Sequence, residues 1–313
     1  MPSFPKPNFV HPFVVNTEIQ RLRAHKATRG IPAKTNDKLL LGSWNIANLG
    51  LQIRTTDHYK LIAEMLEWFD IIAVQEVNDN LEGLRNIESE LPSKYNVIFS
   101  DKGGNDERSA FIYDSTIINQ LELVGEVAVA PKDHKHIKLP GVVQKFKGFD
   151  RNPYLSSFQW KNATFILITV HSFSGGTAKH DLERRALEAY AIGRYADLRN
   201  GSKNAFSKNI LALGDFNIPM IAPGDMVYDA LMKRGLKLPV HSTKVYSNIN
   251  SDKMYDQIAF LPSIKSKIVE HGVFDYDTAI FPELWQTATV ANFRKYLRYF
   301  ISDHRPLWMQ LDL

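Results

Sequence analysis

Residues 210–217 read Ile210-Leu211-Ala212-Leu213-Gly214-Asp215-Phe216-Asn217, an apolar run that ends abruptly in polar side chains. Four consecutive apolar residues followed by glycine are typical of a buried strand. A carboxylate is costly in the middle of such a strand, whereas the strand end can expose it to a site. The stretch therefore predicts a strand that delivers Asp215 to the rim of a sheet.

The same pattern recurs in three other segments. Buried strands are predicted at 39–44, leading to Asn45, at 71–74, leading to Glu76, and at 163–170, leading to His171. Strand ends that meet at one rim gather their side chains into a concave site. We therefore expect the polar residues at these four strand ends to lie together.

Periodic patterns predict the elements between these strands. Apolar residues at helical spacing predict a helix through 61–69, capped by Thr56 or Asp57, and another over 181–199. In the second helix the expected inner face holds Leu182, Leu187, Tyr190, Ala191 and Leu198, and the outer face Glu183, Arg184, Arg185 and Arg194. Further strands are expected at 95–100, 109–113, 258–261 and 307–311. No repeat or linker is evident, so we expect one catalytic domain at 38–313 after an extension at 1–37.

The composition indicates a folded protein with a mild basic excess. The chain has 313 residues, 44% of them hydrophobic, a net charge of +4 and a pI near 9.0. Disordered and fibrous classes are excluded, and a polyanionic partner is weakly favoured. With no cysteine there is no disulfide, no thiolate metal site and no cysteine nucleophile. No apolar leader or membrane-spanning run is evident. We expect a cytoplasmic protein and favour a monomer.

The polar strand-end residues suggest metal-assisted phosphoester chemistry. Carboxylate and amide oxygens suit Mg²⁺ or Mn²⁺ better than zinc, and the candidates are Asn45, Glu76, Asp215, Asn217 and Asp303. His171 and His304 add imidazoles for proton transfer. Each residue alone has a simpler explanation as a turn, cap or solvated side chain, and only their joint occurrence favours a site.

Four motifs in order resemble the endonuclease/exonuclease/phosphatase superfamily over residues 39–313. They are Trp44-Asn45-Ile46, Gln75-Glu76-Val77, Gly214-Asp215-Phe216-Asn217 and Ser302-Asp303-His304-Arg305-Pro306-Leu307. Further segments are most similar to the deoxyribonuclease I-like branch, namely Glu107-Arg108, Arg151 with Pro153, Val170-His171-Ser172 and Tyr255-Asp256-Gln257-Ile258. The blocks typical of inositol polyphosphate phosphatases and abasic-site endonucleases match less well.

The resemblance implies an α/β (α+β) fold, a four-layer αββα sandwich of two mostly antiparallel sheets flanked by helices. It implies Glu76 as the main metal ligand with Asn45 and Asp303 nearby, for Mg²⁺, with Mn²⁺ as a substitute and Ca²⁺ as an assisting ion. Catalytic roles fall to Asp215 and Asn217, which orient the attacking water, and to two histidines with carboxylate partners, His171 with Glu107 and His304 with Asp256. Arg151 and Arg108 are expected to hold substrate phosphate.

The implied activity is divalent-metal-dependent hydrolysis of a nucleic acid backbone, most simply by a DNA endonuclease of low sequence specificity. Two departures loosen the substrate assignment. Asn78 stands where deoxyribonuclease I has a minor-groove arginine, and Asn105-Asp106 stands where that enzyme has a tyrosine that stacks on a sugar. A phosphoesterase for a small molecule or a lipid headgroup is therefore the alternative, and a non-catalytic binding module is a weaker rival.

Three stretches have two interpretations each. The basic residues between Arg21 and Arg29 belong to a surface arm or grip nucleic acid. Residues 131–150 form a solvated loop or contact backbone phosphates through Lys132, Lys135, Lys138, Lys145 and Lys147. The aromatic residues of 293–300 fill the core or stack on unpaired bases.

Overall fold

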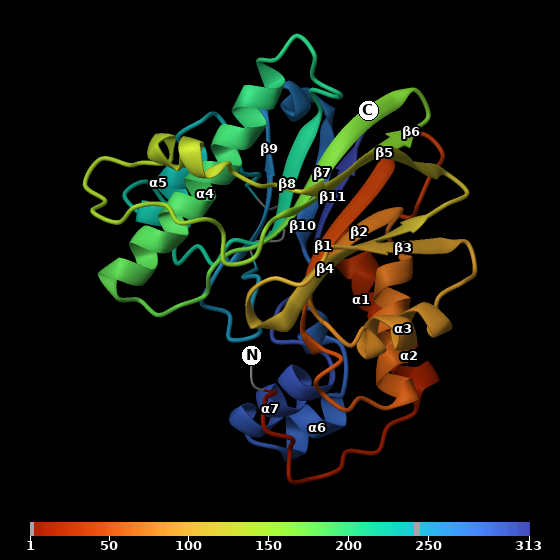
Figure 1. Ribbon diagram of the computed structural model, residues 1–313. Helices are drawn as coiled ribbons and strands as arrows, with labels where there is room; N and C mark the ends of the chain where they lie inside the picture. The colour runs from red at the N-terminus through yellow and green to blue at the C-terminus, as the bar shows by residue number, and fades with distance from the viewer. Residues whose placement is uncertain (1–2, 241–244) are drawn as a thin grey trace.

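The computed structural model describes residues 3–240 and 245–313, which form two packed sheets (Figure 1). The first sheet has the order β10 (Ile268–Val273), β11 (Leu307–Leu311), β1 (Leu39–Leu49), β2 (Ile71–Asn78), β4 (Glu107–Asp114) and β3 (Tyr95–Phe99). The second has the order β5 (Ile118–Glu126), β6 (Tyr154–Trp160), β7 (Ala163–His171), β8 (Ile210–Asp215) and β9 (Asp256–Phe260). Only β1–β2 and β7–β8 pair in parallel among these strands, so the mostly antiparallel prediction is confirmed.

Helices cover the outer face of each sheet (Figure 1). The first sheet carries α1 (Val15–Thr28), α2 (Thr56–Glu67) and α3 (Glu82–Glu90), and the second carries α4 (Lys179–Asn200) and α5 (Met226–Met232). The predicted four-layer sandwich is therefore confirmed. Two further helices, α6 (Pro282–Thr287) and α7 (Val290–Phe300), precede β11, and 3₁₀ turns lie at Gly104–Asp106, Pro131–His136, Pro262–Lys267 and Tyr276–Thr278.

The continuous apolar runs arise because each central strand is buried on both faces. Leu39 and Leu41 of β1 point between the sheets, where they meet Leu211 and Leu213 of β8. Leu40 lies on the opposite face of β1 and packs under the helices. Such a strand has no solvent-facing side, and in β1 and β2 the polar candidate residues lie in the second half of the strand.

The faces of α4 differ from the prediction for 181–199. Leu187, Tyr190 and Ala191 are buried as expected, but Leu198 is 51% exposed. Glu183 and Arg185, expected outside, are buried. Helical periodicity misassigned them because loops, rather than solvent, cover the first half of α4.

The start of α2 also differs in detail from the prediction. The N-cap is Thr55, rather than Thr56 or Asp57, and its side chain does not cap the helix. The Thr55 hydroxyl instead lies 2.7 Å from Nδ1 of His58, a hydrogen bond that replaces the cap.

The N-terminal extension packs on the helix layer through α1. Leu22 is fully buried, and the buried carboxylate of Glu18 accepts the backbone N–H of Phe281 at 2.8 Å. The basic residues pair within the chain: Arg21 with Glu18 and Glu283, Arg23 with Glu64, and His25 and Arg29 with Asp275. These contacts favour a packed segment over a nucleic acid grip.

Burial decides how the aromatic stretch at 293–300 is used. Phe293, Tyr296, Tyr299 and Phe300 of α7 are all buried, which favours the core interpretation. None of the helices in the described ranges combines the length and apolar character that a membrane span requires.

Replacing Leu22 by alanine tests whether α1 is part of the cooperative fold. Leu22→Ala should lower the free energy of unfolding by about 2–5 kcal/mol, because a filled core position becomes a cavity. The matched change Leu198→Ala on α4 should stay within about 0.5 kcal/mol, because that side chain is largely exposed. Urea denaturation of both variants measures the difference, and equal losses would contradict the packing of α1.

Candidate active site

Strand register brings three candidate residues side by side. His171 at the end of β7 pairs with Asp215 of β8, and Asp215 pairs with Asp256 of β9. Gly214 makes this approach possible, since its φ is +135° and a Cβ there would collide with the carbonyl oxygen of Val170. The second sheet therefore contributes an imidazole and two carboxylates from adjacent strand ends.

The first sheet contributes Asn45 and Glu76 from irregular parts of β1 and β2, which continue to Leu49 and Asn78, beyond the ends that the sequence predicted. The β2–β4 register shifts between Val74 and Val77, and Glu76 lies within this bulge with φ +61°. Asn217, after β8, also has a positive φ of +51°. A left-handed conformation is uncommon for non-glycine residues and costs roughly 1–2 kcal/mol. Both strained positions belong to the predicted site, and bulges of this kind re-aim side chains.

Glu76 and Asn45 form a buried pair at the centre of the rim. The Asn45 amide donates to Oε1 of Glu76 at 2.9 Å and to Oδ2 of Asp215 at 3.2 Å. The Asn48 backbone N–H donates to the other Glu76 oxygen at 2.7 Å. Burial raises the pKa of Glu76. The Asn45 Oδ1 atom is buried and has no hydrogen-bond partner among the described residues. This oxygen is therefore available to coordinate a cation or to accept a hydrogen bond from a ligand.

Two imidazoles converge on the same carboxylate oxygen. Nδ1 of His171 lies 2.8 Å from Glu107, and Nδ1 of His304 lies 2.8 Å from Asp256. The opposite ring nitrogen, Nε2, of each histidine is 3.8 Å from Oδ2 of Asp215. Each carboxylate partner fixes the orientation of its ring, so both Nε2 atoms face the centre of the site.

The charges around the imidazoles favour their protonated forms. Burial and Arg151 lower the pKa of His171, but Glu107 and Asp215 outweigh them and raise it. Burial likewise opposes the charge on His304, yet Asp256 and Asp215 raise its pKa well above the ordinary value. Although burial acts in the other direction, His171 and Arg151 lower the pKa of Glu107 to about 2. Glu107 is therefore a carboxylate at neutral pH and stabilises a positive charge on the neighbouring His171 ring.

Ser302 holds the loop that carries Asp303 and His304. Its hydroxyl donates to the Asn45 carbonyl oxygen at 2.7 Å and accepts the His304 backbone N–H at 3.0 Å. Asp303 is 3.1 Å from Nε of Arg298 and is close enough to raise the pKa of Glu76. The loop is therefore tied to β1, and Asp303 faces the Glu76 side of the site.

Asn217 lies beside Asp215 rather than at its reactive oxygen. Its backbone N–H donates to Oδ1 of Asp215 at 2.8 Å, and its amide donates to the Ser172 carbonyl at 3.1 Å. This contact leaves Oδ2 of Asp215 to the two imidazoles and Asn45.

The two arginines expected to hold phosphate are engaged by carboxylates. Arg151 is buried, with Nε 2.7 Å from Glu107 and Nη1 3.2 Å from Asp150. Arg108 pairs with Asp79 and donates to the Ser100 carbonyl at 2.8 Å. Both residues line a small cavity that also contains His171. Direct phosphate contact by either arginine stays a prediction.

Sequence patterns missed two residues of α4 that support the site. Arg185 donates to the carbonyl oxygens of Phe173 at 2.9 Å and Asn217 at 3.0 Å, which joins the loops after β7 and β8. Glu188 accepts the backbone N–H groups of Phe173 at 2.9 Å and Asp150 at 3.0 Å. The only signal in the sequence was that Arg185 and Glu188 are charged residues among the apolar residues of α4. Helical periodicity assigned Arg185 to the solvent-facing side.

Two groups of side chains compete as the metal site. Asp215, Asp256 and His304 present ligand atoms within 4.8 Å of one another. The Asp256–His304 hydrogen bond already explains part of that closeness, and a raised imidazole pKa disfavours a ligand that must be neutral. The group Glu76, Asn45 and Asp303 offers oxygen ligands and the unpartnered Oδ1 atom. We therefore favour the oxygen-rich group for a hard cation.

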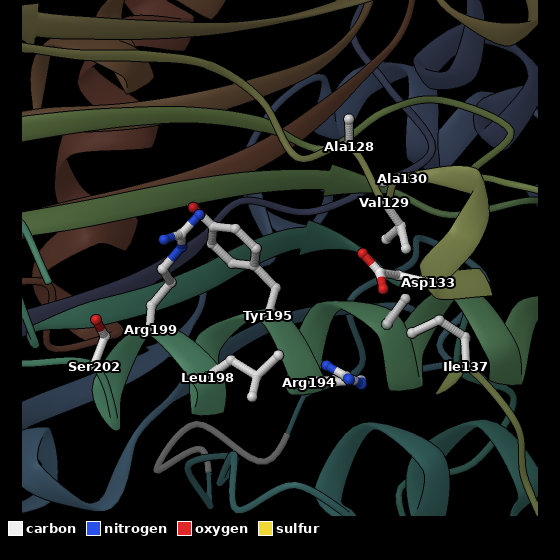
Figure 2. A pocket seen from close by; sticks show the side chains of 11 residues that line it. Ala128, Val129, Ala130, Asp133, Ile137, Arg194, Tyr195, Leu198, Arg199 and Ser202 are labelled. Carbon is white, nitrogen blue, oxygen red and sulfur yellow. The ribbon is translucent and has the colours of Figure 1, made fainter. Parts of the chain in front are cut away.

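A larger cavity lies away from this rim, against α4 (Figure 2). It has a volume of about 510 Å³ and is lined by Ala128 to Ala130, Asp133, Ile137 and residues of α4, among them Arg194, Tyr195 and Arg199. None of the candidate catalytic residues lines it. Its size therefore does not locate the chemistry, which is defined by the convergent groups at the strand ends.

Comparisons with known proteins find the same architecture. No family profile matches the chain, and no curated protein matches its sequence. Among solved structures, an endonuclease/exonuclease/phosphatase family protein of Bacteroides thetaiotaomicron is 19% identical, with a TM-score of 0.56 over 88% of this chain and 94% of that chain. The mannosyl-6-phosphatase Bt3783 of that organism is also 19% identical, with a TM-score of 0.54 over 87% and 98%. D. rerio TDP2 complexed with a single-strand DNA product is 14% identical, with a TM-score of 0.56 over 87% and 98%.

These likenesses establish the fold. The chain has the deoxyribonuclease I-like sandwich of the endonuclease/exonuclease/phosphatase proteins, which confirms at the level of architecture the resemblance carried by its motifs.

The pH dependence of stability tests the buried position of Glu188. Burial raises its pKa from 4.5 to about 7, so the folded state binds this proton more tightly than the unfolded state does. Its contribution is therefore most favourable below pH 4.5, declines as pH rises to about 7, and then stays constant. The decline should be on the order of 3 kcal/mol. Glu188→Gln should lose this component, so urea denaturation at pH 5 and pH 8 should show a smaller change than in wild type. Parallel losses in both proteins would contradict the assignment.

Proposed function

We propose that this protein is a divalent-metal-dependent phosphodiesterase that hydrolyses a nucleic acid backbone. The observation that carries the proposal is the convergence of two carboxylate-held imidazoles on Oδ2 of Asp215, beside the buried Glu76–Asn45 pair. Phosphodiester hydrolysis needs proton donors, an oriented water and stabilisation of a developing negative charge. All three requirements are met by named groups within one rim.

The metal would be held by Glu76, Asn45 and Asp303. Mg²⁺ is the expected ion, because the donors are oxygen atoms and few carboxylates are offered, and Mn²⁺ suits the same ligands. When bound, such an ion supplies Lewis-acid stabilisation of a non-bridging phosphate oxygen. The unpartnered Oδ1 atom of Asn45 and the raised pKa of Glu76 both favour a cation at this position.

The protein groups divide the remaining work between Asp215 and the histidines. Asp215, with Oδ1 held by the Asn217 backbone, orients the attacking water with Oδ2 and accepts its proton. His171 and His304 have raised pKa values, so their protonated Nε2 atoms donate to the phosphate oxygens and the leaving oxygen. Glu107 and Asp256 hold these rings and stabilise their positive charge.

A DNA strand is the proposed substrate, cut internally with little sequence preference. The net charge of +4 and the five exposed lysines of residues 131–150 suit a polyanion. Apolar side chains, including Ile137 and Phe146, bury one face of that segment in the core and leave the lysines outside. The likeness to the TDP2 described with a single-strand DNA product supports the same direction.

A phosphoesterase for a small phosphorylated molecule is the alternative. Asn78 is too short to act as the groove-reading arginine of deoxyribonuclease I, and its side chain accepts the Asn80 backbone N–H at 3.3 Å. The likeness to a mannosyl-6-phosphatase shows that this fold also serves a sugar phosphate in another protein. The two proposals share the metal and imidazole chemistry and differ in the substrate.

Plasmid cleavage tests the proposed chemistry. Supercoiled plasmid should be nicked in Mg²⁺ or Mn²⁺ and left intact in EDTA. His171→Ala should reduce the rate about 10²- to 10⁴-fold, because a proton donor is lost. His180→Ala is the matched control, since His180 lies on the exposed start of α4, and it should cut at the wild-type rate.

Two outcomes would change the assignment. Cleavage that survives EDTA or the His171→Ala change would remove the proposed mechanism. Wild-type protein that leaves every DNA form intact while it hydrolyses a sugar phosphate would favour the small-molecule alternative.

The salt dependence of DNA binding tests the basic segment. Alanine at Lys132, Lys135, Lys138, Lys145 and Lys147 should reduce the slope of log affinity against log salt by about 0.9 for each duplex phosphate contact that is lost. A matched control removes the same charge from five exposed lysines near the ends of β8 and β9 that lie away from Asp215 and Asp256. These are Lys203, Lys208, Lys233, Lys237 and Lys265. Equal slopes for the two variants in a fluorescence anisotropy titration would show a solvated loop at 131–150.

A further inference from the structure

An exposed tryptophan borders a third cavity, next to the loop that carries Asp303 and His304. Trp285 of α6 is 53% exposed, whereas Trp44, Trp68, Trp160 and Trp308 are all buried. Its ring packs nearly perpendicular to that of Phe293, with centroids 5.0 Å apart, which restricts the motion of the indole. The cavity beside it has a volume of about 320 Å³, and its lining includes Ile249, Ile280 and Pro282. An exposed aromatic ring at the edge of an apolar cavity offers a flat surface and a recess to a planar ligand.

The wall of this cavity continues into the loop that carries His304. Arg305 lines the cavity and directly follows His304, at a Cα separation of about 3.8 Å. The Ile249 backbone N–H donates to the Asp303 carbonyl at 3.0 Å, and Arg305 donates to the Ser251 hydroxyl at 3.1 Å. An occupant of the cavity therefore lies beside the same loop that presents Asp303 and His304 to the catalytic rim.

The charges around the cavity favour a ligand whose apolar part enters the cavity and whose anionic part stays at its edge. Asp277, which lines the cavity, is paired with Arg305 at 2.6 Å, and the nearby Glu283 is paired with Arg21 at 2.6 Å. Arg294 also lines the cavity and has no carboxylate partner among the described residues; it donates a long hydrogen bond of 3.5 Å to the Asn250 carbonyl oxygen. Within the described part of the chain, an arginine without a carboxylate partner thus lines the same cavity as the exposed indole.

We infer that this cavity binds an unpaired base of the nucleic acid substrate, which stacks on Trp285 while Arg294 contacts the adjoining phosphate. The inference rests on the proposed function and adds a subsite to it. A base has an aromatic face that can stack on the indole. The phosphate attached to its nucleotide can serve as the counter-ion of Arg294. A base paired within a duplex cannot stack on Trp285, so the subsite favours single strands and transiently unpaired segments of a duplex. DNA and RNA share this chemistry.

Tryptophan fluorescence and affinity test the subsite in EDTA, where metal-dependent cleavage is prevented. Short oligothymidylate and oligouridylate should quench the exposed tryptophan, whereas a strand of abasic sugar-phosphates should not. Trp285→Leu should weaken oligothymidylate binding about 5- to 150-fold, as expected for loss of one stacked base. Trp285→Phe, which keeps a stacking ring, should retain most of the affinity. Arg294→Gln should weaken binding of the abasic strand as well.

The matched control is Phe206→Leu, because Phe206 is another exposed aromatic residue, 43% exposed and outside this cavity. It should bind every strand like wild type, and circular dichroism establishes folding of each variant. Equal oligothymidylate affinities for Trp285→Leu and wild type would overturn the subsite. An equal loss on the abasic strand, or Trp285-dependent binding to neutral lipid vesicles in place of oligonucleotides, would also overturn it.

Hydrolysis of bis(p-nitrophenyl) phosphate by wild-type protein separates the two proposals. Turnover of this compound without any Trp285-dependent binding of oligonucleotides would reject the base subsite and leave the phosphodiesterase. Trp285-dependent binding by a protein that hydrolyses no phosphodiester would reject the proposed activity and support the subsite.

Discussion

The Oδ2 atom of Asp215 is the point around which the site is arranged. Two Nε2 atoms approach it at 3.8 Å, and the Asn45 amide donates to it at 3.2 Å. These groups come from both sheets, so their meeting depends on how the sheets pack. A buried carboxylate is costly without such partners, and the partners in turn need a fixed anion between them. The two central layers are thereby coupled at the rim by polar contacts as well as by their shared apolar core.

Holding that arrangement requires strain at the rim and support behind it. Glu76 and Asn217 adopt left-handed backbone conformations, which the surrounding structure must stabilise. Arg185 and Glu188 provide part of that support, because they bind the backbone of the loops after β7 and β8 from the covering helix. Ser302 does the equivalent work for the His304 loop. The rigidity of the site thus depends on buried polar contacts one step away from its centre.

The sequence predicted the strand-end residues well because doubly buried strands leave a simple signature. Short apolar runs ahead of Asn45, Glu76, His171 and Asp215 indicate both the strands and the rim. Glu107 and Asp256 were expected only from the family resemblance, since neither follows such a run. The inward turn of Arg185 was missed, because helical periodicity assumes one buried face and solvent opposite. Which loops cover a helix is a tertiary property that local patterns do not contain.

Sequence patterns also do not determine which aromatic side chains are buried, and this matters for the substrate specificity that we propose. The spacing of Tyr296 and Phe300 favoured the core and left stacking on bases as the alternative, and the structure buries both side chains. Trp285 carried no signal in the sequence, yet it is the tryptophan that remains exposed. At the end of β2, Asn78 is paired in register with Glu107, and its side chain serves a local turn. No arginine stands at this position to read a duplex groove, so the proposed nuclease would have to recognise DNA elsewhere, and the proposed base subsite at Trp285 offers one such place. Stacking on an indole accepts any base, so recognition of this kind would require no particular sequence.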